Sequence, residues 1–309
     1  MLLILLCYPF LCLKSFNGNN AIGFKVVYLT MVYVLTKKFR FTVMLKDICI
    51  PSARVSINDI ISVGSLKEFI EEHVEKYHIL PTTAIQIFSR GKLQGLSEAT
   101  RILRSLTVFD VEVYFITPIG LLWEDEPLIP YAGCLDDISI ESMKRLFRIF
   151  NTEDAIYDII ETQPDFLYLY VNTKLIKLLD LINYIPRDTL TILVSDTGLI
   201  ANRENIRAIY PSSSLITIFK KYGLKISSEN FPGTFLLYLS RFLYKLSFEM
   251  NTEKFIEYLL KVKSDPKDFL SIITSPEALI FVEKAKDQSI LKFIRFSEDD
   301  SHGGKRANR

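Results

Sequence analysis

The sequence predicts an α+β fold, in which a domain of strands and one helix precedes a mainly α-helical region. Two observations carry this prediction. Between residues 38 and 118, apolar residues alternate with other residues in several short segments, which is typical of half-buried strands. From residue 138 onward, apolar residues recur instead at the spacing of amphipathic helices. With 309 residues, the chain is long enough to give each part a core of its own.

In the first part, the predicted elements follow the order of two strands, one helix and two further strands. Ser62 or Ser65 is placed to cap the helix, Glu68 completes a capping box three residues after Ser65, and Pro81 follows the helix end. The predicted strands are residues 39–45, 54–57, 85–88 and 111–116. A hairpin, a helix and two more strands make the β-grasp arrangement, so we expect a β-grasp domain at residues 38–118.

Three short runs in this part resemble ubiquitin-like domains. They are Val63 to Ile70 at the start of the helix, Ile87 to Lys92 in the next strand and turn, and Thr100 to Val108 before the last strand. The resemblance covers roughly a quarter of the chain. It implies a ubiquitin-like domain whose sheet exposes an apolar face to ubiquitin-binding proteins or proteasome receptors.

Phe88 holds the central apolar position of this implied face, because it precedes the turn at Gly91 and Lys92. Glu112 stands where a histidine is usual in ubiquitin, so the exact partner stays open. The alternative is that these side chains pack under the helical region or the N-terminal extension. The implied binding residues are Ile48, Phe88, Arg90, Lys92, Glu112 and Tyr114.

A short internal repeat marks the helical region at residues 138–296, which follows a linker at residues 119–137. Asn151-Thr152-Glu153 recurs as Asn251-Thr252-Glu253, and Asp165-Phe166-Leu167 recurs as Asp268-Phe269-Leu270. The two units, at about residues 142–185 and 249–295, resemble the STI1-type helical repeats of ubiquilin-like proteins. Two departures are that most caps lack proline and that the chain has only 5 methionines for an adaptable groove.

The resemblance to STI1-type repeats implies a groove that holds hydrophobic client segments. The alternative is that the two units pack on each other and leave no groove. Residues 297–309 are polar and predict a disordered tail, in which Gly303-Gly304 lies too far from the last predicted strand for conjugation. The implied groove residues are Phe166, Leu175, Leu178, Phe269 and Leu279.

The apolar N-terminal extension, residues 1–37, allows three interpretations. Its first run has the length of a signal-peptide core, yet no basic residue precedes it and no small-residue cleavage site follows. It is therefore a signal or membrane anchor, extra β-structure or a disordered lead, or a segment upstream of a true start at Met31.

Composition and motifs exclude several function classes. The 37 basic and 36 acidic residues balance, so we expect no nucleic-acid partner. The 4 cysteines form no CxxC pair and are expected to be reduced thiols, as in a cytosolic protein. The 3 histidines match no catalytic or metal-binding motif, and no phosphate-binding loop is present. We therefore expect no enzyme activity, no metal and no cofactor.

Together, these features predict a non-enzymatic adaptor in ubiquitin- and proteasome-dependent quality control. The ubiquitin-like domain would bind receptors, and the helical region would hold clients, in the cytoplasm or nucleus. The alternative is a quality-control factor that residues 1–35 anchor at the endoplasmic reticulum membrane. A third class, an enzyme with a ubiquitin-like regulatory domain, would need catalytic residues in the helical region, and the sequence offers none there.

Overall fold

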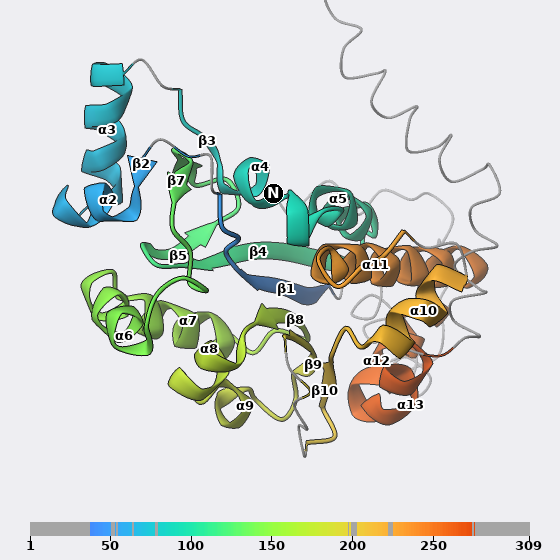
Figure 1. Ribbon diagram of the computed structural model, residues 1–309. Coiled ribbons are helices and arrows are strands. Elements are labelled where there is room, and N and C mark those ends of the chain that lie inside the picture. Colours follow the sequence, from blue (N-terminus) through green and yellow to red (C-terminus); the bar gives the residue numbers. More distant parts are fainter. Residues whose placement is uncertain are drawn as a thin grey trace, which may run out of the picture. The chain divides into compact units, whose positions relative to one another are not determined.

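A six-stranded sheet is the centre of the computed structural model, which describes residues 38–50, 53, 55–63, 65–77, 80–196, 198, 203–221, 225–273 and 275. The strands are β1 (Phe39–Lys46), β4 (Phe109–Thr117), β5 (Gly120–Trp123), β8 (Phe166–Val171), β9 (Leu190–Ser195) and β10 (Ile206–Ile209). Their order in the sheet is β10-β9-β8-β1-β4-β5 (Figure 1). β5 is antiparallel to β4, and all the other neighbouring pairs are parallel.

This topology shows that the predicted fold class is wrong. β1 pairs in parallel with β4 on one side and with β8 on the other. Strands from residues 38–118 and from residues 138–296 therefore form one sheet, instead of a β-grasp domain followed by a helical region. Because helices lie between the parallel strands in the sequence, the fold is α/β.

The error has a physical cause in the buried strands. All six residues of β8 and all six of β9 are buried, so both strands are continuously buried runs without a solvent-exposed face, although β9 includes Thr191 and Ser195. Such runs are typical of parallel sheets that helices cover on both faces, and periodicity alone does not distinguish them from buried helices. Conversely, residues 84–88, most of which were expected to form a strand, make the short helix α4 (Ala84–Phe88).

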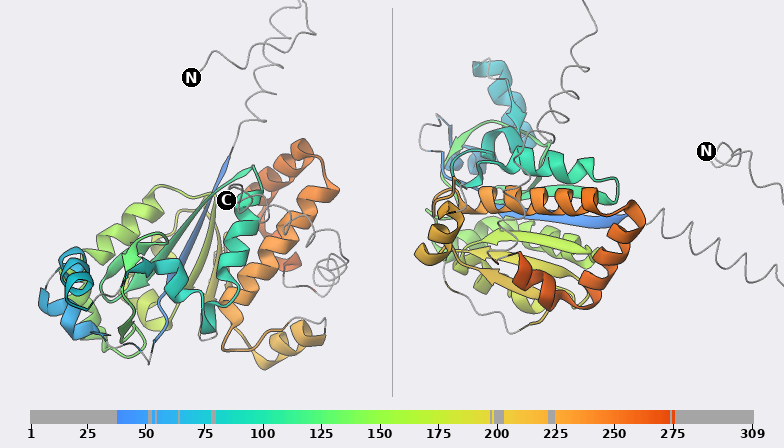
Figure 2. Two further views of the ribbon diagram at one scale, coloured as in Figure 1. Left: turned by 90° about the horizontal axis from the view of Figure 1, so that it is seen from above. Right: turned by 90° about the vertical axis from the view of Figure 1, so that its right-hand side faces the viewer.

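Helices cover both faces of the sheet, as the left view of Figure 2 shows. One face is covered by α6 (Ile140–Ile149), α7 (Thr152–Glu161), α8 (Thr173–Leu178) and α9 (Leu181–Tyr184), whose apolar side chains pack on those of β1, β8 and β9. The other face is covered by α5 (Leu96–Ser105), α11 (Phe231–Glu249) and α12 (Thr252–Ser264). On that face, Phe109 of β4 contacts Phe41 of β1, Phe166 of β8 and Phe255 of α12 edge to face.

The remaining elements lie around this three-layered core. An insertion between β1 and α4 contains α2 (Ile57–Val63) and α3 (Leu66–Tyr77), and α3 begins after Ser65 as predicted, with Glu68 N donating to Ser65 Oγ at 3.4 Å. Two small strand pairs join the insertion to the segment after β5. They are β2 (Val55–Ser56) with β7 (Tyr131–Ala132), and β3 (Thr82–Thr83) with β6 (Pro127–Leu128). The other helices are η1 (Gly91–Leu93), α10 (Ser213–Lys221) and α13 (Pro266–Ile272).

The two predicted STI1-like units do not adopt a common structure. Phe166 lies in strand β8, whereas its counterpart Phe269 lies in helix α13. Asn251 caps α12 by accepting a hydrogen bond from Lys254 N at 2.9 Å, whereas Asn151 has a left-handed backbone and makes no such bond. The recurring tripeptides therefore both lie at helix starts, but they share neither the cap hydrogen bond nor a larger unit.

Some predictions fall on residues outside the described part of the chain. These are the predictions for the extension at 1–37, for the tail at 297–309 and for Leu279.

Within the described residues, none of the helices combines the length and the apolar character that crossing a membrane would need.

Candidate functional site

The strand order places a topological switch point beside β1. When the five parallel strands are numbered by their appearance in the chain, their order from β4 to β10 is 2-1-3-4-5. The chain thus winds from β1 to one side and then returns to β8 on the other side. In open α/β sheets, ligands bind outside the carboxyl ends of the strands at such a point. The carboxyl ends of β1 and β8 are therefore the expected ligand position.

Polar side chains from three segments meet there around the carboxylate of Asp136, which lies on a fourth segment. Lys46 at the end of β1 and Lys92 of η1 both form ion pairs with Asp136 Oδ2, the second at 3.5 Å. Asn172, which follows β8, donates from Nδ2 to Asp136 Oδ1 at 2.9 Å. The side chain of Lys46 is only 2% exposed, whereas those of Asp136 and Lys92 are 32% and 46% exposed. Solvent therefore reaches this cluster from the side of Lys92.

Burial and charge shift the proton affinities of the central pair. Burial lowers the pKa of Lys46 below its ordinary value, although the hydrogen bond and negative charge of Asp136 oppose this shift. Partial burial alone would raise the pKa of Asp136, but Lys46 and Asn172 outweigh it and hold this pKa below its ordinary value. The ring of Tyr170 lies 5.3 Å from Lys46 Nζ and offers its π face to the cation.

Asp47 anchors the segment that carries Asp136. Its carboxylate is fully buried, with Oδ1 accepting from Leu135 N at 3.0 Å and Oδ2 accepting from Tyr131 Oη at 3.3 Å. Burial raises the pKa of Asp47 to about 7 in spite of these hydrogen bonds and of the nearby Lys46. Because both oxygens bind groups of the protein, Asp47 holds the segment rather than facing a ligand.

The raised pKa of Asp47 predicts a pH-dependent stability. The folded chain holds the Asp47 proton up to about pH 7, whereas the unfolded chain releases it near its ordinary value of 3.8. The folded state thus binds more protons between these values, and its stability falls as the pH rises from about 4 to about 7. Asp136 does not interfere above pH 4, because its lowered pKa places its effect at more acidic pH.

Asp47→Asn should remove this dependence. We expect wild type to lose roughly 3 kcal/mol more unfolding free energy than Asp47→Asn between pH 5 and pH 8. Urea denaturation of both chains at the two pH values measures the difference. If wild type and Asp47→Asn lost the same unfolding free energy between pH 5 and pH 8, Asp47 would have an ordinary pKa in the folded state.

A disulfide at this edge corrects the expectation of four reduced thiols. Cys49 and Cys134 are 85 residues apart in sequence and are joined, with a Cα–Cα distance of 4.9 Å. No spacing motif could indicate this pair, because only the meeting of the segments after β1 and β7 brings the two residues together. Cys7 and Cys12 lie outside the described residues.

The structure separates the six residues of the predicted binding face. Phe88, its central residue, is fully buried and packs on Phe115 with ring centroids 5.0 Å apart. Glu112 and Tyr114 are partly buried on β4, Arg90 is exposed, and Ile48 is partly buried after β1. Only Lys92 belongs to the cluster around Asp136. The burial of Phe88 and the parallel sheet show that residues 38–118 do not form the β-grasp domain on which the expected adaptor function depended. The adaptor function itself and its membrane-associated alternative, which depends on residues 1–35 outside the described part of the chain, stay predictions.

The predicted client-groove residues that the structure describes belong to the protein core. Phe166, Leu175 and Phe269 are buried, and Leu178 is partly buried against the core beneath α6–α9. Leu279 lies outside the described residues. These side chains stabilise the fold and do not line a groove.

The cluster residues that sequence reasoning missed carry a recognisable signal. Lys46 and Asp47 directly follow the buried apolar run of β1, and Asn172 directly follows that of β8. Charged or amide residues at the carboxyl ends of buried strands are typical of α/β ligand sites. This signal becomes readable only when both runs are recognised as parallel strands.

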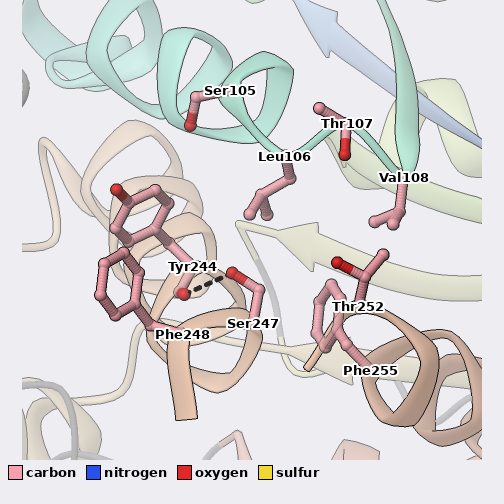
Figure 3. Close-up of a pocket in the computed structure, with 9 residues that line it drawn as sticks. All are labelled: Ser105, Leu106, Thr107, Val108, Tyr244, Ser247, Phe248, Thr252 and Phe255. Carbon is pink, nitrogen blue, oxygen red and sulfur yellow. Dashed lines mark hydrogen bonds between the residues drawn. The ribbon is translucent and has the colours of Figure 1, made fainter. Parts of the chain in front are cut away.

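A pocket of about 210 Å³ lies at the opposite, amino edge of the sheet, between the end of α5, the start of β4, and helices α11 and α12 (Figure 3). Leu106, Val108 and Phe255 supply apolar walls, and Ser247 Oγ donates to the backbone oxygen of Tyr244 at 2.6 Å. The polar side chains of the lining are all hydroxyls. The pocket therefore lacks the charged groups that meet around Asp136 at the carboxyl edge.

Comparisons with protein-family models, curated proteins and solved structures give no match for this chain. Its function has to be inferred from the chemistry of the Asp136 cluster.

Proposed function

We propose that this chain binds a small ligand through an anionic oxygen group, a carboxylate or a phosphate, at the carboxyl edge of its sheet. One observation carries the proposal. The ammonium groups of Lys46 and Lys92, from different parts of the chain, converge on the same oxygen of Asp136 at the switch point between β1 and β8. Ligands of doubly wound folds bind at this place.

Asp136 then acts as an internal occupant of the ligand position. Its carboxylate presents the chemical group that two ammonium groups and the Asn172 amide are arranged to bind. It sits on the segment between β7 and α6, so a movement of that segment would vacate the position. Two cations face the Asp136 carboxylate, and the neighbouring Asp47 keeps its proton up to about pH 7. Below that pH, a positive charge is therefore left to attract a second anion.

Asp136→Ala should turn the cluster into an anion site that can be titrated. Removing the internal carboxylate leaves Lys46, Lys92 and Asn172 without their shared acceptor. We expect acetate, inorganic phosphate or both to raise the melting temperature of this variant with increasing concentration, because a ligand that binds only the folded state stabilises it. Wild type should respond less, since its own carboxylate competes. The two anions distinguish a carboxylate site from a phosphate site.

The matched control is Asp137→Ala, which removes the next carboxylate along the chain. Asp137 is exposed and faces Cys134 Sγ at 3.5 Å rather than the two lysines. This variant should respond to anions as wild type does, and Lys46→Met combined with Asp136→Ala should abolish the response. Equal responses of Asp136→Ala and Asp137→Ala to both anions would contradict the proposal.

A further inference from the structure

The end of β1 and the residues that follow it contact three successive residues, 134 to 136, of the segment that carries Asp136. Cys49 is bonded to Cys134, the Asp47 carboxylate accepts from Leu135 N, and Lys46 pairs with Asp136. Lys174 Nζ adds two longer contacts of 3.4 Å to the backbone oxygens of Asp136 and Ile138. Of these tethers, only the disulfide is covalent, and it is the one that a change in redox conditions can remove.

We infer that the Cys49–Cys134 disulfide is a redox switch of the anion site, whose reduction frees the Asp136 segment and opens the Lys46–Lys92 position to an external anion. This inference rests on the function proposed above. The inference depends on the close spacing of these contacts. Cys134 of the disulfide lies two residues before Asp136, whose carboxylate occupies the site.

The two sulfurs differ in accessibility in a way that sets the course of the exchange. Cys49 is exposed, whereas Cys134 is fully buried. A thiolate of an external dithiol can attack the Cys49 sulfur, which breaks the bond to Cys134 and forms a mixed disulfide with Cys49. The second thiol of the dithiol then attacks the mixed disulfide, so that the dithiol leaves as a disulfide. Two electrons and two protons pass to the chain, which becomes Cys49-SH and Cys134-SH.

In the reduced chain, a hydrogen-bond acceptor lies close to the new Cys134 thiol. Cys134 Sγ lies 3.5 Å from Asp137 Oδ2, so the thiol can donate to that carboxylate. The remaining tethers of the Asp136 segment are hydrogen bonds and ion pairs, which break and re-form. The fraction of molecules with a vacated site then rises, and the apparent affinity for an external anion rises in proportion to that fraction.

The test uses the full-length chain, oxidised or treated with dithiothreitol, with peptide mass spectrometry to establish the state of Cys49 and Cys134. Acetate and inorganic phosphate are the probes, and binding is measured by calorimetry. We expect reduction to tighten anion binding by wild type roughly tenfold. Cys49→Ser/Cys134→Ser should bind as tightly as reduced wild type under both conditions. Cys7→Ser/Cys12→Ser keeps the switch and should respond as wild type does.

Two results would overturn the inference: a pair that dithiothreitol does not reduce, or an affinity that is equal in the oxidised and reduced chains. If the double variant does not fold, Cys49→Ser alone removes the disulfide at its exposed end. The Asp136→Ala variant separates the two claims. If it binds anions while wild type ignores its redox state, only the switch fails. If it binds neither anion, the proposed function fails as well.

Discussion

Gly233→Ala should destabilise the chain by roughly 3 kcal/mol or more, or prevent its folding. A Cβ atom at this position of α11 would lie 2.4 Å from Leu93 C and 2.5 Å from Gln94 O. Both are backbone atoms and cannot rotate away, so α11 or the η1–α5 segment would have to shift. Overpacking of this kind costs about 1–3 kcal/mol or more. The gain from replacing a helical glycine by alanine, at most about 1 kcal/mol, does not offset it.

Thr234→Ala is the matched control for this substitution, because Thr234 is the next residue of α11 and is only partly buried. We expect it to change the unfolding free energy by less than about 1 kcal/mol. Chemical denaturation of the two variants and wild type makes the comparison. Equal stability of Gly233→Ala and wild type would mean that α11 does not pack on this backbone.

Asp136→Ala should destabilise the chain by roughly 3 kcal/mol at pH 7, because Lys46 remains buried without its counter-ion. Loss of the counter-ion costs little at Lys92, because nearly half of its side chain is exposed to water. Combining Lys46→Met with Asp136→Ala should recover most of the loss, because an apolar side chain of similar length then replaces the uncompensated charge.

A double-mutant cycle in urea measures this coupling, with Asp137→Ala as the control that should lie within about 0.5 kcal/mol of wild type. Additive losses from Lys46→Met and Asp136→Ala would mean that the two side chains do not form a buried pair. The cycle is independent of anion binding, so it tests the geometry of the cluster separately from its function.

Local sequence signals predicted several elements and failed on their assembly. β1, α3 and β4 were placed within a few residues, because alternation, caps and helical periodicity are local properties. The partner of β1 is not local. Its neighbours β4 and β8 begin at Phe109 and Phe166, and only the backbone pairing of β1 with both of them makes one parallel sheet. The alternating patterns at residues 39–45 and 54–57 predicted a hairpin, whereas the chain makes a long crossover from β1 to the parallel strand β4.

The site was predictable only in part for the same reason. Lys92 was predicted to be a binding residue because it lies in the predicted turn after Phe88. It does belong to the Asp136 cluster, but there it pairs with a carboxylate instead of contacting a protein partner. Lys46, Asp136 and Asn172 are 90 and 36 residues apart in sequence, and only the switch point brings them together. Phe88 was predicted to be exposed and is buried. An apolar residue before an exposed turn can face either the solvent or the core, and the local sequence does not distinguish the two.

The most direct measurement is a crystal structure of Asp136→Ala grown or soaked with acetate and with inorganic phosphate. The account predicts density for one of these anions between Lys46 Nζ and Lys92 Nζ, with Asn172 Nδ2 donating to it. It also predicts that the parallel strands β1 and β8 flank this position. A vacated position that holds only water at saturating concentrations of both anions, with both lysines in place, would contradict the account.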